Sequence, residues 1–246
     1  MISVVLGRRG CGKTTLIKGV IASRPRLLVF DTLAEYGRSG KVFRSIPPLI
    51  DYVEANAYGQ FRAVYQPVET QDLETDFSDF MRLAWIAGAN TIVVDEIDQV
   101  SSPSSVPDQL ARNLRYGRHR KMFVIAASRR AADVPRLITS QADELYTFNQ
   151  TEPRDIQYIA EFAGKDFAQR TLSLPLYKAL VYRPFDGTIS ERMSDSPKEK
   201  ILTLRGSSPN NSSEESPIPK TPPTEPEHDE DPQPADDTTE DDEQTA

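Results

Sequence analysis

A glycine-rich stretch directly after an apolar run is the feature that most constrains the fold of this chain. Residues 7–14, with the sequence GRRGCGKT, match the pattern G-x-x-x-x-G-K-[ST] at every fixed position. The preceding run Ile2–Leu6 has the near-continuous apolar content of a buried strand, and a helix is expected from Thr14 to Ala22. Glycines let the loop turn its N–H groups inward around an anion, and the helix adds its positive N-terminal end. The stretch therefore predicts a strand, a phosphate-binding loop and a helix in register, which argues against a glycine-rich turn formed by chance.

The side chains of this loop predict its ligands. Lys13 is expected to reach the β- and γ-phosphates of a nucleoside triphosphate, and the Thr14 hydroxyl is expected to ligate Mg²⁺. ATP and Mg²⁺ are therefore the predicted cofactors. Cys11 stands at a variable position and is expected to be a small packing residue rather than a redox switch. The predicted nucleotide-binding residues are Gly7, Arg8, Arg9, Gly10, Cys11, Gly12, Lys13, Thr14 and Thr15.

A second apolar run, which ends in two adjacent carboxylates, predicts the other half of the site. Thr91–Val94 is followed by Asp95 and Glu96, and the segment resembles a Walker B motif. Because side chains alternate along a strand, the two carboxylates are expected to point in different directions. Asp95 is predicted to approach Mg²⁺, usually through water, and Glu96 is predicted to polarise the attacking water. The alternative, two solvated acids at a strand end, is disfavoured by the phosphate-binding loop upstream.

The body of the chain alternates short aliphatic runs with amphipathic stretches. This alternation predicts an α/β fold with a mostly parallel central sheet and helices on both faces. The expected strands are Ile2–Leu6, Arg26–Phe30, Arg62–Tyr65, Thr91–Val94, Met122–Ala126 and Glu144–Phe148, with Ala179–Tyr182 as a late edge strand. The expected helices are Thr14–Ala22, Ile46–Asn56, Asp72–Ala87, Asp108–Tyr116 and Glu152–Ala163.

Charge divides the chain into a body and a tail. Residues 207–246 contain 13 acidic residues and one lysine, a net charge of −12, whereas the whole chain carries −8, so residues 1–206 carry +4. The same segment holds eight prolines and little apolar content, which is typical of a disordered tail. We therefore expect a P-loop ATPase domain in residues 1–190, a transition segment in 191–206 and a disordered, acidic, proline-rich tail in 207–246.

Composition also narrows the cellular setting. Cys11 is the only cysteine, which excludes an intrachain disulfide and a cysteine-based zinc cluster. No apolar stretch approaches the roughly 20 residues that span a bilayer, and the sequence begins without a basic leader. These features predict a soluble, cytoplasmic protein with no membrane span.

Beside the two Walker-type motifs, three further segments make the sequence similar to the HerA/FtsK group of ring-forming ATPases, and within it to the small genome-packaging ATPases of viruses. In residues 27–36, an apolar run ends in an Asp that is followed by a Glu-Tyr pair. In residues 112–130, an arginine-rich segment precedes a run that ends in Ser-Arg-Arg. In residues 142–155, the last expected core strand is followed by Glu-Pro-Arg-Asp. The resemblance covers most of residues 1–165 and implies a RecA-like P-loop ATPase core.

The resemblance also implies roles for several arginines. The group usually has a polar sensor, commonly Gln, where this chain has Arg129, so Arg129 is expected either to contact the γ-phosphate or to have lost the sensor role. In such rings an arginine enters the neighbouring subunit's site and is typically worth ~10³–10⁵ in rate. Arg115 and Arg118 are the candidates, with a solvated basic face as the alternative. The predicted catalytic residues are Lys13, Glu96, Arg115, Arg118 and Arg129.

The function implied by these features is ATP hydrolysis coupled to movement of nucleic acid. We expect a homo-oligomeric ring that packages double-stranded viral DNA, with sequence-independent contacts to DNA and with capsid or portal-vertex proteins as further partners. Arg38, Lys41 and Arg44 either line the pore of such a ring or belong to an exposed charged loop. The host cytoplasm or a capsid vertex is the expected location. The alternatives are a phage DNA-export ATPase similar to zonular occludens toxin, whose relatives usually carry a membrane span, and a non-translocating P-loop switch or kinase.

Overall fold

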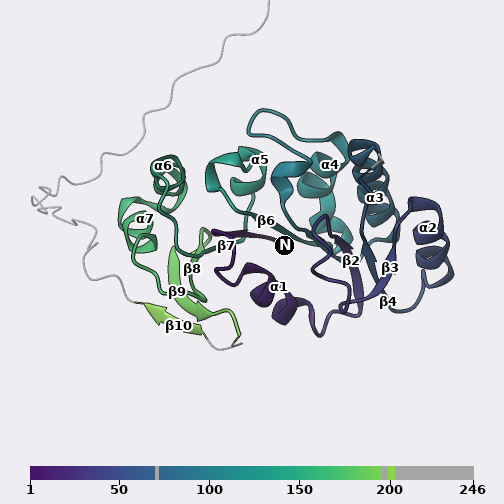
Figure 1. The fold of residues 1–246 in the computed structure, drawn as a ribbon, viewed down its shortest axis with the longest axis horizontal. Helices are drawn as coiled ribbons and strands as arrows, with labels where there is room; N and C mark the ends of the chain where they lie inside the picture. The colour runs from purple at the N-terminus through teal and green to yellow at the C-terminus, as the bar shows by residue number, and fades with distance from the viewer. Residues whose placement is uncertain (70–71, 196–198, 203–246) are drawn as a thin grey trace, which may run out of the picture. The chain divides into compact units, whose positions relative to one another are not determined.

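The computed structural model describes residues 1–69, 72–195 and 199–202, the last four by their backbone only. In this part of the chain, ten strands form one sheet in the order β10-β9-β8-β7-β1-β6-β5-β2-β4-β3 (Figure 1). The strands are β1 (Ile2–Leu6), β2 (Arg26–Phe30), β3 (Lys41–Phe43), β4 (Phe61–Tyr65), β5 (Thr91–Val94), β6 (Phe123–Ser128), β7 (Glu144–Thr147), β8 (Lys178–Arg183), β9 (Thr188–Met193) and β10 (Glu199–Leu202). All pairings from β7 across to β3 are parallel, and β8, β9 and β10 extend the sheet as an antiparallel meander.

The strand order brings the two Walker-type motifs to one edge of the sheet. β6 lies between β1, which leads into the glycine-rich loop, and β5, which leads into the paired carboxylates. The register pairs Leu6 with Ser128 and Val94 with Ala126, so the carboxyl ends of these three strands lie together. β2 ends beside β5 and adds a fourth loop to the same edge. Ligands of open α/β sheets bind outside the carboxyl ends of the strands, which is where these loops meet.

Helices cover both faces of the sheet (Figure 1). Their bounds are α1 (Lys13–Ile21), α2 (Ile46–Ala55), α3 (Leu73–Ala87), α4 (Asp108–Tyr116), α5 (Arg136–Thr139), α6 (Pro153–Ala163) and α7 (Lys165–Thr171). Side chains of α1, including Leu16 and Ile17, pack with Val5 and Val29 in one buried cluster. The other six helices contribute to the cluster on the opposite face. These two clusters confirm the predicted arrangement of helices on both faces of the sheet, with α1 on one face and the other six helices on the opposite face.

Local sequence explains where these helices begin and which face they bury. In α3 the Asp72 side chain accepts hydrogen bonds from the backbone N–H groups of Glu74 and Thr75, which caps the first turn. Phe77 and Phe80 follow at helical spacing and both are fully buried. The Phe30 ring of β2 meets them edge-on at centroid distances of 5.0 and 5.3 Å. This aromatic cluster fixes α3 against the strand whose end carries part of the site.

The prediction of the central elements is confirmed, and the differences lie mainly in the C-terminal part of the body. All six core strands and all five helices form within one or two residues of the expected ends. β3, β9, β10, α5 and α7 were not predicted, and β8 is an inner strand rather than an edge strand. The sheet continues through residue 202, so the boundary expected at residue 190 falls inside β9. The tail expected at 207–246 lies outside the described residues.

No helix among the described residues is both long and apolar enough to cross a membrane.

Candidate active site

The glycine-rich loop between β1 and α1 has the backbone that a phosphate-binding loop requires. Gly10 and Gly12 have φ angles of +77° and +110°, a region that L side chains rarely adopt. At Gly7 a Cβ atom would stand 2.6 Å from the Cys11 Sγ, so a side chain there has no room. Gly12 is the N-cap of α1 and provides no side chain to the free N–H groups of the first turn. The loop therefore leaves these donors to an anion.

Lys13 is held in the centre of this loop. It is 7% exposed, and its Nζ donates hydrogen bonds to the backbone carbonyls of Gly7, at 2.7 Å, and Arg8, at 3.4 Å. The structure thus holds the Lys13 ammonium against the backbone carbonyls of the glycine-rich loop.

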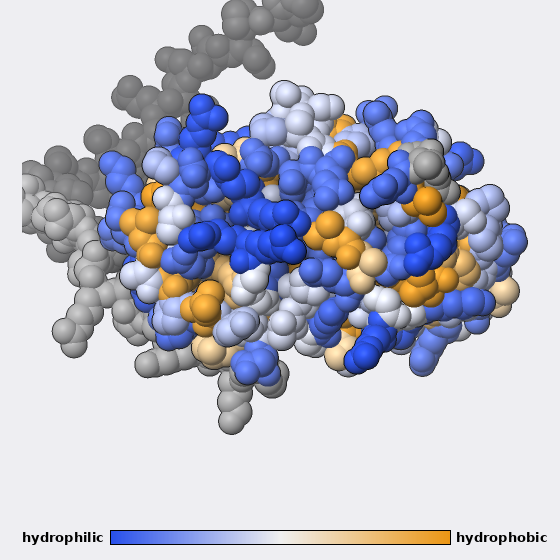
Figure 2. All heavy atoms as spheres, viewed as in Figure 1, coloured by the Kyte–Doolittle hydropathy of each residue, from blue (hydrophilic) through white to orange (hydrophobic). Residues whose placement is uncertain are grey.

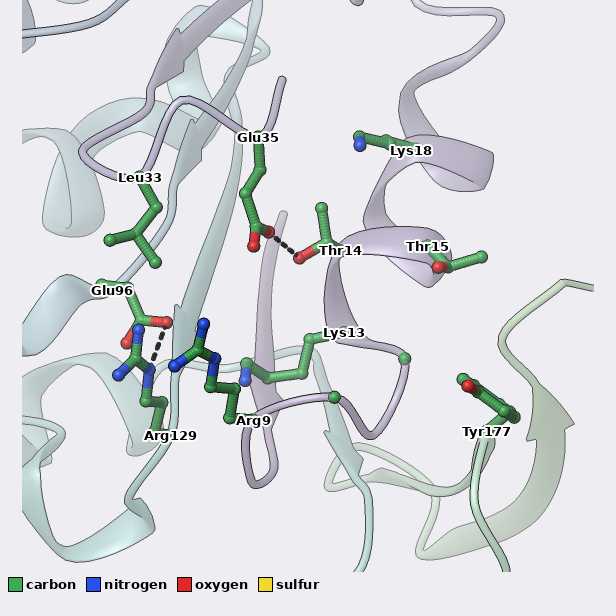
Figure 3. A pocket seen from close by; sticks show the side chains of 12 residues that line it. Arg9, Lys13, Thr14, Thr15, Lys18, Leu33, Glu35, Glu96, Arg129 and Tyr177 are labelled. Carbon is green, nitrogen blue, oxygen red and sulfur yellow. Dashed lines mark hydrogen bonds and ion pairs between the residues drawn. The ribbon is translucent and has the colours of Figure 1, made fainter. Parts of the chain in front are cut away.

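A cavity of about 620 Å³ opens in front of the loop, and residues from five segments line it (Figure 3). Four of its side chains are cationic, from Arg9, Lys13, Lys18 and Arg129, and two are acidic, from Glu35 and Glu96. The excess of positive charge suits a triphosphate. The remaining residues that line the cavity are Gly10, Gly12, Thr14, Thr15, Leu33 and Tyr177.

Three of the predicted nucleotide-binding residues shape the loop and do not line this cavity. They are Gly7, Arg8 and Cys11. Cys11 is buried and packs against Gly7, in accord with a packing role. Burial raises the pKa of the Cys11 thiol, and the charge of Lys13 offsets only part of this rise, so the sulfur stays protonated.

Asp95 and Glu96 follow β5 and are almost completely buried. Burial raises the pKa of Asp95 to about 7, the carboxylates of Glu96 and Glu35 add to the rise, and Lys13 opposes it. Glu96 has a left-handed backbone, with φ 54° and ψ 59°, in place of the extended geometry of the strand before it. Of the two residues, Glu96 lines the cavity and Asp95 does not.

A third carboxylate, Glu35, belongs to the site and was not among the predicted site residues. The Thr14 hydroxyl donates a hydrogen bond of 2.6 Å to Glu35 Oε2 (Figure 3). Asp31, fully buried at the end of β2, accepts hydrogen bonds from the backbone N–H groups of Glu35 and Tyr36 and so fixes this loop. An acid four residues beyond the Asp that ends a core strand was the signal available in the sequence.

The residues around Thr14 fit a hard divalent cation such as Mg²⁺. Asp95 Oδ1 is buried and has no hydrogen-bond partner among the described residues. The Thr14 hydroxyl donates its proton to Glu35, which leaves the lone pairs of the Thr14 oxygen available to a cation. A cation beside Asp95 would relieve the repulsion that raises its pKa. No group of three or more His, Cys, Asp or Glu side chains within the described ranges forms a cage for a metal. Mg²⁺ usually takes one or two carboxylates and completes its shell with water and phosphate oxygens.

The end of β6 supplies the residues next to Glu96. Arg129 Nε donates to Glu96 Oε1 at 2.8 Å, with the Arg129 side chain 40% exposed and that of Glu96 6% exposed. Ser128 Oγ donates to Asp98 at 2.9 Å. Arg130 Nε pairs with the buried Asp155 at 2.9 Å and so ties the strand end to α6. Arg129 thus lines the cavity and orients Glu96, whereas Arg130 contacts a carboxylate of the scaffold.

The structure does not bring Arg115 and Arg118 to this cavity. Both line a separate pocket beside Met1 and Ile2, at the amino end of β1, whereas the glycine-rich loop follows the carboxyl end of the same strand. Arg112, three residues before Arg115 in α4, lies over the Trp85 ring at 4.4 Å. Arg115 and Arg118 therefore lie at the opposite edge of the sheet from the glycine-rich loop of their own chain.

Comparisons with known proteins agree with this geometry. Residues 3–150, more than half of the chain, match the sequence profile of the ATPase family associated with various cellular activities (AAA). The fold is similar to that of the genome packaging NTPase B204 from Sulfolobus turreted icosahedral virus 2 in complex with ATP-gammaS, with 21% identity and a TM-score of 0.67 over 78% of this chain and 95% of that chain.

Two further solved structures share the fold. The DNA-packaging ATPase B204 from Sulfolobus turreted icosahedral virus has 22% identity and a TM-score of 0.63, over 78% of this chain and 96% of that one. VirB4 of Thermoanaerobacter pseudethanolicus has 10% identity and a TM-score of 0.51, over 84% and 90%. No curated protein sequence matches the chain.

At these identities the structures show the fold alone, and they confirm the predicted P-loop ATPase core. The family match covers both Walker-type motifs, the Glu35 loop and the end of β6. With this match and the loop geometry together, the chain is an ATP-binding ATPase and belongs to the ATPase family associated with various cellular activities (AAA).

Proposed function

We propose that this ATPase is a motor that moves double-stranded DNA and packages a viral genome into a capsid. The observation that carries the proposal is the similarity of the fold to a genome packaging NTPase across 95% of that chain. The body charge of +4 in residues 1–206 supports a polyanionic partner. On this proposal the protein works as a homo-oligomeric ring in the host cytoplasm, at a capsid or portal vertex.

The chemical step is assigned to the residues that line the cavity. Lys13 donates to the β- and γ-phosphates in place of the Gly7 carbonyl. Thr14 and Asp95 would hold Mg²⁺, which supplies neutralisation of the phosphate charge. Glu96 accepts a proton from the water that attacks the γ-phosphorus, while the bond to the β-phosphate oxygen breaks and ADP leaves. Arg129 holds the Glu96 carboxylate in place through its 2.8 Å contact.

Arg115 and Arg118 act, on this proposal, in the site of a neighbouring subunit. Their position at the far edge of the sheet from their own glycine-rich loop supports action in trans rather than in cis. DNA contacts are assigned to the segment around β3, where Arg38 and Arg44 are exposed. The ammonium of Lys41 lies over the rings of Phe43 and Tyr52, which leaves the two arginines as the better phosphate ligands of this segment.

ATPase rates with and without DNA test the proposal. Duplex DNA without sequence preference should raise the rate several-fold at 50 mM salt and much less at 300 mM, because Lys and Arg contacts to phosphate displace counterions. The Lys13→Ala variant is the control for contaminating ATPase activity. Mass photometry with ATP and Mg²⁺ should show a closed oligomer. A chain that stays monomeric and hydrolyses ATP at one rate with or without DNA would refute the motor.

The same experiment separates the alternatives. Stimulation by single-stranded DNA alone would favour a DNA-export ATPase. Phosphate transfer to an acceptor, with no response to DNA, would favour a kinase, and slow hydrolysis that changes the binding of another protein would favour a switch.

A further inference from the structure

We propose that Tyr177 is the platform on which the base of ATP stacks. The inference rests on the ATP site of this chain and is independent of whether the ATPase moves DNA. Tyr177 immediately precedes β8 and is 170 residues away from the glycine-rich loop in the sequence, yet its ring lines the same cavity (Figure 3).

Two backbone hydrogen bonds fix Tyr177 against the glycine-rich loop. Its N–H donates to the Cys11 carbonyl at 3.1 Å, and its carbonyl accepts from the N–H of Ser194, the residue after β9, at 2.7 Å. A Cβ atom built on Gly12 would lie 3.1 Å from Cδ1 of the Tyr177 ring, so the ring stands directly beside the loop. The β8–β9 hairpin thus carries this aromatic side chain to the nucleotide site.

The backbone of Tyr177 is in an unfavourable conformation. Its φ angle is 65°, in the left-handed region that bulky residues rarely adopt. Such conformations persist where surrounding contacts hold them, and they cluster at ligand sites. Glycine or asparagine would adopt a left-handed backbone at a lower conformational energy. An aromatic residue at this position therefore indicates that its side chain functions in the site.

The positions of the residues that line the cavity indicate which part of ATP lies beside Tyr177. Figure 3 shows Glu96 and Arg129 on one side of Lys13 and Tyr177 on the other side. The Tyr177 ring lies beside Gly12, where a Cβ atom would be 3.1 Å from its Cδ1. Because Glu96 activates the water at the γ-phosphate, the chain of phosphates leads away from Glu96 toward Tyr177. The base is therefore at the Tyr177 end, where a residue that is 50% exposed offers a free ring surface. Base–aromatic stacking accepts any base because each has a π-face.

Exposure alone does not identify a residue that stacks on a base, because exposed aromatic residues also occur away from the cavity. Phe185 lies between β8 and β9 of the same hairpin and is 100% exposed, but it does not line the cavity and its φ angle is not positive. Phe185 therefore serves as a matched control.

Binding of ATP and of inorganic tripolyphosphate, which has phosphates but no base, tests the proposal by calorimetry. Tyr177→Ala should weaken ATP binding about tenfold to a hundredfold and leave tripolyphosphate binding within twofold of the wild-type value. Tyr177→Phe, which keeps the ring and loses the hydroxyl, should bind ATP as the wild type does. Phe185→Ala should change neither ligand. Equal weakening of both ligands by Tyr177→Ala would show a structural role in the loop, and unchanged ATP binding would also overturn the proposal.

A fluorescent variant tests base stacking in a second way and shows whether weaker ATP binding by Tyr177→Ala results from misfolding. The chain has one tryptophan, Trp85, in α3 on the opposite face of the sheet from α1. Tyr177→Trp should gain a fluorescence signal that ATP quenches and tripolyphosphate does not. A signal that responds equally to both ligands, or to neither, would contradict stacking of the base on residue 177. Failure here would leave the proposed DNA motor untouched, since DNA-stimulated hydrolysis needs the phosphates and not this ring.

Discussion

Glu96 combines a buried carboxylate with a left-handed backbone at the point where β5 ends. Such a conformation costs on the order of 1–3 kcal/mol and is maintained by its surroundings. The Arg129 contact provides part of that support, because the guanidinium both compensates the buried charge and fixes the direction of the side chain. At the position where the HerA/FtsK group commonly has Gln, this chain has an arginine that contacts the buried carboxylate of Glu96.

Replacement of Glu96 by glutamine tests its role as the general base. Glu96→Gln keeps the size and the hydrogen bonding of the side chain but cannot accept a proton, so kcat should fall by about 10²–10⁴ while ATP still binds. Single-turnover assays with radiolabelled ATP, together with equilibrium binding, separate the two effects. Asp98→Asn is the control, since Asp98 lies two residues away and contacts Ser128 outside the cavity. Turnover of Glu96→Gln at the wild-type rate would assign the base to another residue.

At the scale of elements, the glycine-rich loop and the β8–β9 hairpin fit each other closely. A Cβ atom at Gly12 would lie 2.8 Å from Ser194 Oγ and 2.9 Å from its Cβ, while one at Gly10 would meet nothing within 4 Å. Both glycines have positive φ, so the two positions differ in the space around them and not in the sign of φ.

This difference predicts unequal effects of the same substitution. Gly10→Ala should lower the free energy of unfolding by about 1–2 kcal/mol through its backbone alone. Gly12→Ala should cost about 1–3 kcal/mol more, because Ser194 must also move. Urea unfolding measures both values. Adding Ser194→Gly to Gly12→Ala should recover part of the extra loss, and the absence of any recovery would mean that the hairpin does not press on the loop.

The elements that the sequence predicted well share one property. β1, β2, β5 and the long helix α3 have strong apolar periodicity or a specific motif, and each forms near its expected bounds. β3, β9 and β10 are short or carry charged residues, so their pairing depends on neighbours that are remote in sequence. α5 and α7, of four and seven residues, are too short to leave a clear period.

The same distinction applies to the site. Lys13, Thr14, Asp95 and Glu96 stand in local motifs, and all four lie at the carboxyl ends of β1 and β5. Glu35 and Tyr177 reach the cavity only because β2 lies beside β5 and because the hairpin folds back onto the loop. For Glu35 the spacing from Asp31 was a signal in the sequence, whereas no spacing pointed to Tyr177. The positions of Arg115, in α4, and Arg118, just after it, likewise depend on how this segment packs at the amino end of β1.

At the scale of the whole molecule, the separation of Arg115 and Arg118 from the glycine-rich loop of their own chain predicts catalysis across an interface. Arg115→Ala or Arg118→Ala should bind ATP normally, and at least one should lose most of its hydrolysis. Mixing that variant with Glu96→Gln should restore part of the rate, because each subunit supplies what its neighbour lacks.

Turnover of the mixture, compared with each variant alone, is the measurement. Arg112→Ala is the matched control, since Arg112 stacks on Trp85 within its own chain. Subunit exchange without any recovery of the rate would argue against an arginine supplied in trans from either position.

The central place of β1 has a consequence for how the protein is made. β1 is synthesised well before its two partners, β6 and β7, since Val4 pairs with Ala126 and Leu145. At a synthesis rate of 5–20 residues per second, the strand waits roughly 10–30 s before both partners exist. During that time its apolar side chains and the glycine-rich loop after it have no sheet to join, and ATP has no formed site to bind. β2, β4 and β5 lie closer together in the sequence and pair with one another, so they can form a sheet before β1 has both of its partners.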